Sequence, residues 1–362
     1  AQDSAGRLTD IAVDHSEFAH LGEAQIDAVV AVMRAHGLTA TVADANGGAG
    51  AWDTTLTNWN TAATAGSAIA WPSAGTDNDS VFGGTAAGIV TVDAGGVTVN
   101  DITFSTAGYD VTGGPLTLSG APVVANAVNA TISSSLSGTS GLTKSGAGTL
   151  TLSGTNTGLS GTLTLSTVTG AANAGINLSG SDADGGLTQI DVNGSGTVAD
   201  GSYLGLINAD LGSGLTINLT GQGGNSTPGT LRGLGGASVV DGPVNINSPL
   251  VRISNYTGGT SLTLNGKVTN ITPSNGCFIR FANSQGVILT NTGNSWAGTT
   301  VLGEGSLYCY PGALPAASNL QIGGSNPADF GTNGTFDRAL GTAAGQVQFG
   351  RANDGQRAMG FS

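Results

Sequence analysis

Histidine, the side chain best suited to proton transfer near neutral pH, is confined to one short stretch of this chain. All three histidines, His15, His20 and His36, precede residue 37. Nucleophilic catalysis that depends on a histidine base is therefore not expected in the rest of the chain. His15 and His20, with Asp14 and Glu17, could suggest a metal cluster, but their spacing matches no standard site, and acidic residues are also favoured at a helix start. We predict no catalytic residue, no metal site and no cofactor.

Two acidic clusters are similar to the start of a calcium-binding loop. They are Asp-Asn-Asp at residues 77–79 and Asp-Ala-Asp-Gly-Gly at residues 182–186. A calcium loop needs more oxygen ligands at fixed steps and a bidentate glutamate, which neither cluster provides, and such residues more often close turns. A sugar-cleaving enzyme would also need a base near the acids, whereas Lys144 and Arg232 are distant in sequence. A polysaccharide lyase or hydrolase stays an unsupported alternative.

The two cysteines, Cys277 and Cys309, allow two interpretations. In a reducing compartment they would be small buried side chains without a chemical role. In an exported protein they form a candidate disulfide between neighbouring coils, which is the interpretation that we favour if the chain is exported.

Aromatic side chains, which carbohydrate-binding surfaces use as platforms, fall into two groups. Trp52, Trp59 and Trp71 are expected to fill the first coil of the body rather than to bind sugar. The second group surrounds the cysteines and is expected to form a local core rather than a sugar groove. Its members are Phe278, Phe281, Trp296, Tyr308 and Tyr310.

Composition excludes some classes of partner. The net charge is −13 with ten lysines plus arginines and no basic cluster, so nucleic-acid binding has no electrostatic basis. No run of about 18 apolar residues is present, which predicts that no helix spans a membrane. The start Ala1-Gln2-Asp3 suits a mature N-terminus left by a signal peptidase.

The chain divides into two segments of different texture. Residues 1–48 are predicted to form a cap, with an amphipathic helix over 17–36, a short strand over 38–42 and a break over 46–50. Residues 49–362 are rich in glycine, and apolar residues alternate with Thr and Asn in short runs. This alternation predicts many short strands with one buried side.

Internal repeats favour stacked coils over a sandwich of hairpins. The sequence GTLTLS occurs at 148–153 and again at 161–166, and GPLTLS occurs at 114–119. Near-identical units are typical of a β-solenoid, in which each coil buries its face on the next.

These residues also carry a family resemblance. Residues 141–157 (GLTKSGAGTLTLSGTNT) resemble the autotransporter-associated β-strand repeat of Gram-negative surface proteins, and residues 287–301 resemble a second copy. The resemblance implies export to the outer cell surface, structural or adhesive roles and no catalytic residues. It also implies an all-β, right-handed parallel β-helix, and the different texture of residues 1–48 adds a short N-terminal helical cap. Because residues 357–362 fall inside a repeat, we expect the body to continue in a longer precursor.

The sequence therefore predicts a non-enzymatic, extracellular or cell-surface structural or adhesive protein. Expected partners are further copies of the chain, in an oligomer, fibre or surface layer, or other components of the cell surface. A glycan-binding module is the first alternative, and the lyase or hydrolase is the second.

Overall fold

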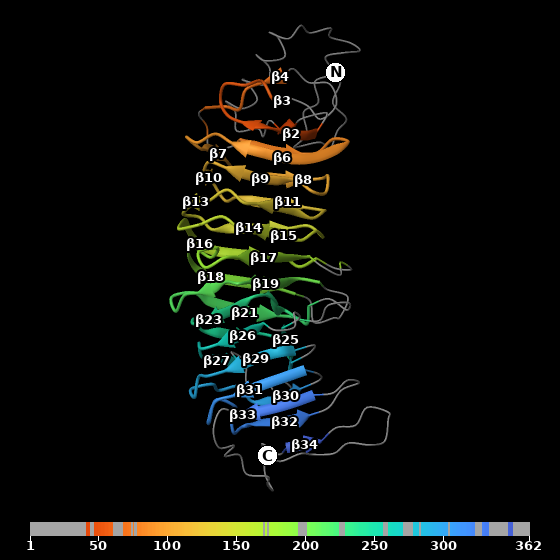
Figure 1. Cartoon of the computed structure of the whole chain (residues 1–362), viewed down its shortest axis with the longest axis vertical. Helices are drawn as coiled ribbons and strands as arrows, with labels where there is room; N and C mark the ends of the chain where they lie inside the picture. The colour runs from red at the N-terminus through yellow and green to blue at the C-terminus, as the bar shows by residue number, and fades with distance from the viewer. Residues whose placement is uncertain are drawn as a thin grey trace, which may run out of the picture.

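The part of the chain that the structure describes forms a rod of short strands stacked coil upon coil (Figure 1). The computed structural model describes residues 41–43, 47–60, 68–73, 75, 78–168, 171, 174–194, 201–223, 229–255, 260–270, 278–281, 284–302, 305–322, 328–332 and 347–349. These residues contain no helix, so the all-β class is confirmed, and none of them offers a helix suited to crossing a membrane. The helix predicted over 17–36 lies outside the described residues.

Three faces run along the rod. The first face is formed by β1 (Thr41–Ala43), β5 (Asp79–Phe82), β8 (Ile102–Phe104), β11 (Val123–Asn126), β14 (Leu142–Ser145), β16 (Gly158–Leu165), β18 (Gly186–Asn193), β21 (Thr216–Thr220), β24 (Val244–Ile246) and β27 (Val268–Asn270).

The second face is, within the described residues, a ladder of 13 strands. They are β2 (Gly47–Trp52), β6 (Ala86–Val92), β9 (Asp110–Gly113), β12 (Ala130–Ile132), β15 (Leu150–Leu152), β17 (Gly175–Ser179), β19 (Tyr203–Ile207), β22 (Leu231–Gly235), β25 (Leu250–Asn255), β28 (Phe278–Phe281), β30 (Gly298–Leu302), β32 (Ser318–Ile322) and β34 (Val347–Phe349). At about 4.8 Å between strands, this ladder is about 60 Å long.

The third face has two sections. The N-terminal section consists of β7 (Val97–Val99), β10 (Leu116–Leu118) and β13 (Leu136–Gly138). The C-terminal section consists of β20 (Asp210–Leu211), β23 (Ala237–Val240), β26 (Ser261–Leu264), β29 (Ser284–Leu289), β31 (Gly305–Cys309) and β33 (Ala328–Thr332).

All strand pairs on the three faces are parallel, and the pairing repeats from coil to coil. On the second face Leu152 lies opposite Ile132 and Leu178, and Leu178 lies opposite Leu206. All four side chains are almost fully buried, while Thr131, Thr151 and Asn177, which alternate with them along β12, β15 and β17, are partly exposed. Burial of each such side chain is worth about 1.5–3 kcal/mol, so columns of stacked Leu, Ile and Val hold the coils together. The parallel β-solenoid is therefore confirmed.

The repeated sequence that indicated stacking does not itself stack. Residues 114–119 contain β10 on the third face, residues 148–153 contain β15 on the second, and residues 161–166 contain the end of β16 on the first. The copies are alike because every face needs the same Leu-Thr-Leu alternation. The repeat thus marks one strand, whereas a coil contains three.

The first strands of the solenoid lie in the segment where the sequence predicted a cap and a break. The break predicted over residues 46–50 is wrong from Gly47 onward, because Gly47–Trp52 forms the strand β2, which pairs with β6. Gly88 allows β6 to lie close to β2, because a Cβ at this position would lie 2.5 Å from the Ala49 nitrogen. The strand predicted over 38–42 overlaps β1, which pairs with β5. The division of the chain at residue 48 stays a prediction.

An N-terminal aromatic cluster fills the first coils. Trp52 is fully buried, and its ring centroid lies 5.0 Å from that of Trp71 and 5.1 Å from that of Trp59. The Trp71 Nε1 donates a hydrogen bond to the Thr98 carbonyl at 2.9 Å. A short antiparallel pair, β3 (Trp59–Asn60) and β4 (Ala68–Ile69), brings Trp59 to this cluster. The three tryptophans are core residues, as predicted. The remaining members of the cluster are Phe82, Phe104 and Tyr109.

Two buried asparagines explain why the repeat motif contains Asn. The side-chain oxygen of Asn156 accepts a hydrogen bond from Leu136 N in one neighbouring coil, and its nitrogen donates to Ala183 O in the other. Asn294, in the second copy of the motif, bonds in the same way to Val268 N and Ala313 O. Each asparagine therefore satisfies buried backbone groups of two other coils, and the two turns share this bonding pattern.

Candidate binding surface

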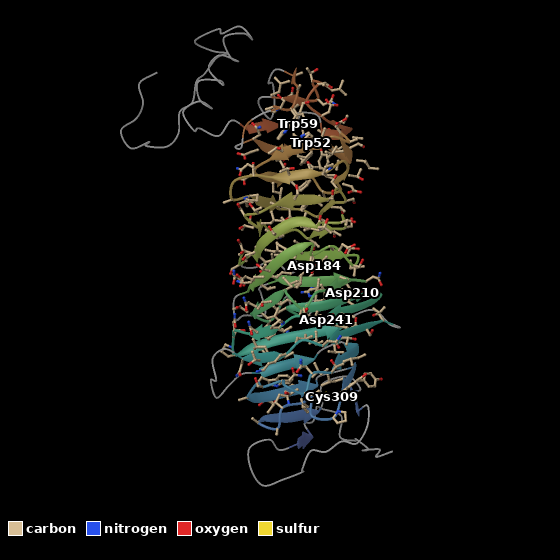
Figure 2. The ribbon with its side chains drawn as sticks, turned by 90° about the vertical axis from the view of Figure 1, so that its left-hand side faces the viewer. Trp52, Trp59, Asp184, Asp210, Asp241 and Cys309 are labelled. Atoms are coloured by element: carbon tan, nitrogen blue, oxygen red, sulfur yellow. The ribbon has the colours of Figure 1, made fainter. Side chains whose placement is uncertain are left out.

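The acidic clusters do not assemble a metal centre within the described residues, where no three His, Cys, Asp or Glu side chains gather around one point. Asp184 is buried, burial raises the pKa of its carboxyl group, and its Oδ2 accepts a hydrogen bond from Gly212 N. Figure 2 shows Asp184, Asp210 and Asp241 in succession along one side of the rod. The three histidines, Asp14, Glu17 and Asp77 lie outside the described residues.

A shallow depression at the ends of β2, β6 and β9 contains two other carboxylates, those of Asp53 and Asp93. Asp53 accepts hydrogen bonds from the backbone of Leu56 and Thr55, and these bonds lower the pKa of its carboxyl group. Asp93 accepts a bond from Gly95 N. Both acids thus cap turns, and the lowered pKa of Asp53 is the opposite of what a general acid for sugar cleavage requires.

The two cations considered as possible bases have structural contacts instead. Lys144 points into the solenoid, and its Nζ donates to the carbonyls of Gly146 at 2.6 Å and Gly148 at 2.7 Å. Burial lowers the pKa of this amine to about 8. Arg232 is buried, with its Cζ 3.5 Å from the ring centroid of Tyr203, a cation–π contact. Neither side chain projects toward a surface where a substrate would bind.

The candidate disulfide cannot be placed from one cysteine alone. Cys309 is buried in β31 and lies opposite Leu289 and Thr332. Cys277 lies outside the described residues, and the pairing stays a prediction.

The outer surface of the first face is a continuous row of small polar side chains. The Asn218 Nδ2 donates to the Asp191 carboxylate at 2.6 Å, and the Asn245 Nδ2 donates to the Asn218 side-chain oxygen at 2.8 Å. One carboxylate is therefore followed by amides rather than by further charges, which avoids repulsion between directly opposed side chains. In register, the row consists of Thr143, Thr164, Asp191, Asn218, Asn245, Thr269 and Ser295.

The second aromatic group is only partly a core. Trp296 is buried, as expected, and its Nε1 donates to the Thr300 hydroxyl at 2.8 Å. The expectation is wrong for Tyr308 and Tyr310, which are 45% and 41% exposed. Both follow buried residues of β31, and alternation along the strand directs them to the outside. The side chains of the two remaining members, Phe278 and Phe281, are not among those that the structure describes.

Sequence reasoning missed a polar ladder beside these tyrosines. The Asn265 Nδ2 donates to the Asp241 carboxylate at 2.8 Å, and the Thr290 hydroxyl donates to the Asn265 side-chain oxygen at 2.7 Å. Asp241, Asn265 and Thr290 each follow a strand of the third face directly. That shared position after a strand is visible in the sequence, but only once the strands of one face are known.

The fold and these surfaces define an elongated β-solenoid with polar, weakly charged faces, the architecture expected of an autotransporter passenger. The comparison with known proteins supports this class. Over 232 residues the chain is 36% identical to the autotransporter adhesin BmaC of Brucella suis biovar 1 (strain 1330). The match includes 55% of this chain but only 7% of the adhesin. No family model matches the chain, and no solved structure matches it.

Proposed function

We propose that this chain is an adhesive, non-enzymatic segment of a surface protein of a Gram-negative bacterium. The observation that carries the proposal is the 36% identity to an autotransporter adhesin, in a chain that forms a parallel β-solenoid. The same resemblance leads us to propose a right-handed winding, and the texture of residues 1–48 leads us to propose a helical cap there.

The chemistry of the described surfaces agrees with this role. The carboxylates of the depression cap turns, and the buried cations Lys144 and Arg232 bond within the rod. The faces instead present rows of hydroxyl and amide groups over many coils. A long, rigid and regularly patterned surface suits repeated weak contacts with another surface, whose strength multiplies when several sites bind together.

Adhesion can be tested with beads that carry the purified chain. We expect the beads to attach to cultured epithelial cells more often than beads that carry the same chain after thermal unfolding. Albumin-coated beads give the background. Attachment at the albumin level, on several cell types and on extracellular matrix, would contradict an adhesive role.

Self-association is a separate part of the proposal. A solenoid exposes main-chain hydrogen-bonding groups at its end coils, and such edges can pair with another copy. Negative-stain electron microscopy is expected to show fibres or layers at high protein concentration. Single rods at every concentration, together with a monomer mass in sedimentation, would contradict assembly.

A further inference from the structure

Two exposed tyrosines lie two residues apart at the end of a strand of the third face: Tyr308 is in β31, and Tyr310 directly follows it. Among the described residues, four large apolar or aromatic side chains are strongly exposed: Leu56, Ile89, Tyr308 and Tyr310. The two tyrosines are separated by a single residue, the buried Cys309, whose position on the rod is marked in Figure 2. Tyrosine provides a large and rigid contact surface at a low cost in conformational entropy, so an exposed pair indicates a binding surface.

The neighbouring coils leave these rings accessible. Tyr308 lies opposite Ile288 on one side and Gly331 on the other, and a glycine has no side chain with which to cover a ring. Tyr310 occupies the position after β31 that Thr290 occupies after β29: Tyr310 N donates to Leu289 O, as Thr290 N donates to Leu264 O. Tyr310 therefore holds the backbone position that continues the column of the polar ladder.

The ladder supplies hydrogen-bonding groups beside the rings. Successive coils place Asp241, Asn265, Thr290 and Tyr310 at the same position after a strand. A carboxylate, an amide, a hydroxyl and an aromatic residue therefore follow one another along the rod. The step between coils is about 4.8 Å, close to the length of one pyranose ring. Sugar hydroxyls match the polar groups, and the C–H face of a sugar ring packs on an aromatic face.

We propose that Tyr308 and Tyr310, with the ladder of Asp241, Asn265 and Thr290, form a binding subsite for a neutral glycan chain. This inference rests on the proposed adhesive function and names the chemistry of the partner. A protein partner would favour a desolvated apolar pocket around the tyrosines, whereas these rings lie on an open surface beside polar groups. The carboxylates of Asp210 and Asp241 on this face, together with the net charge of −13, disfavour an anionic glycan.

The test uses the full chain on a printed array of neutral oligosaccharides that end in glucose, galactose or N-acetylglucosamine, with heparin as the anionic comparison. We expect binding to at least one neutral glycan and none to heparin. For the glycan that binds best, calorimetry measures the affinity. The double variant Tyr308→Ala/Tyr310→Ala is expected to weaken it about tenfold or more, which corresponds to about 1.4 kcal/mol.

Three further variants make this result specific. Tyr308→Phe/Tyr310→Phe keeps the rings and is expected to retain most of the binding. Asn265→Ala interrupts the ladder and is expected to weaken binding by a smaller factor. Ile89→Ala, which removes an exposed apolar side chain on the second face, is the matched control and is expected to bind like the unaltered chain. Circular dichroism verifies that all four variants are folded.

The proposal is overturned if no neutral glycan binds, if heparin binds best, or if the double alanine variant binds as well as the unaltered chain. The bead-attachment assay on cells distinguishes the failure of this glycan subsite from the failure of the proposed adhesive function. Beads that attach to cells equally with and without the tyrosines would retain the adhesive function and exclude this subsite. A partner protein, rather than a glycan, would be indicated if attachment needed the tyrosines but survived enzymatic removal of cell-surface glycans.

Discussion

The two ends of the solenoid use aromatic residues in opposite ways. In the first coils, Trp52, Trp59 and Trp71 are almost fully buried, and their rings contact one another edge to face or tilted. Near the other end, Tyr308 and Tyr310 project from the third face into solvent. Both groups lie in a ladder of parallel coils, so the fold does not decide which aromatic is structural. The position of each residue relative to the inward-facing column decides it.

This difference separates stability from binding. A tryptophan of the N-terminal aromatic cluster contributes to the free energy of unfolding through buried area and ring contacts. An exposed tyrosine contributes little to that free energy and is available to a partner. If the two groups have these different roles, their substitution should affect different measurements.

The largest effect is expected from Trp52→Ala. Removal of this fully buried ring leaves a cavity among its aromatic neighbours, and the free energy of unfolding should fall by about 3–5 kcal/mol. Urea denaturation followed by circular dichroism measures the change. Tyr308→Ala, the comparison from the other end, should lower the same free energy by no more than about 0.5 kcal/mol. Equal losses in the two variants would remove the distinction between the groups.

The next effect concerns Asn156 and Asn294, which occupy the same turn in the two halves of the rod. Alanine at either position leaves two buried backbone groups without partners, and the free energy of unfolding should fall by about 2–3 kcal/mol in total. We expect similar losses in both variants, measured by urea denaturation. Asn129→Ala is the control, because the bond from Thr149 N to Asn129 is exposed and water can replace it. A loss in only one half would show that the halves are built differently.

A pH effect is expected from Lys144, in the interior of the N-terminal half. The pKa of this amine is about 8 in the folded chain and 10.5 without burial, so between these values the unfolded chain binds more protons. Stability should therefore rise with pH from about 8 to 10.5, by at most about 3 kcal/mol, and stay level below pH 8. A neutral amine still has two protons for the carbonyls of Gly146 and Gly148.

The measurement is the free energy of unfolding at pH 7 and at pH 10. Lys144→Met should abolish the part of the rise that comes from this amine, whereas Lys267→Met, which alters an exposed lysine, should retain it. An identical pH dependence in all three proteins would mean that Lys144 titrates normally.

The smallest effect is expected on the surface of the C-terminal half. Asn218→Asp places a second carboxylate opposite Asp191 and replaces an attractive hydrogen bond by repulsion. The loss should be about 1 kcal/mol or less, and it should shrink in high salt. Thermal unfolding at low and high salt measures it. Asn245→Asp, one coil further from Asp191, should lose less; an equal loss would exclude direct repulsion.

The sequence was sufficient to predict the coils but not their arrangement on the faces. The alternation of Leu with Thr indicates which side of a strand is buried, and from this alternation the all-β solenoid and its core were predicted correctly. The same alternation does not indicate on which face of the solenoid a strand lies, because β15 and the end of β16 have the same sequence and occupy different faces. Face assignment depends on the lengths of the turns between strands, which no local pattern encodes.

The exposed tyrosines show a similar limit. Their proximity to the cysteines suggested a core, since aromatic side chains and cysteines are usually buried. The stronger signal was alternation: Leu307 and Cys309 take the inward positions of β31, which leaves Tyr308 and Tyr310 outside. The polar ladder could not be predicted without the assignment of strands to faces, because Asp241, Asn265 and Thr290 are far apart in sequence and meet only when the coils stack.

The bonds of Asn156 and Asn294 have an evolutionary consequence. Each asparagine contacts main-chain atoms of the adjacent coils, an N–H on one side and a carbonyl on the other. Such a contact does not depend on the type of residue that provides it. A duplicated or deleted coil would therefore meet a compatible neighbour at this turn without a compensating mutation. Gene segments that encode whole coils can thus be gained or lost, which lets the reach of the rod change while its surface chemistry varies independently.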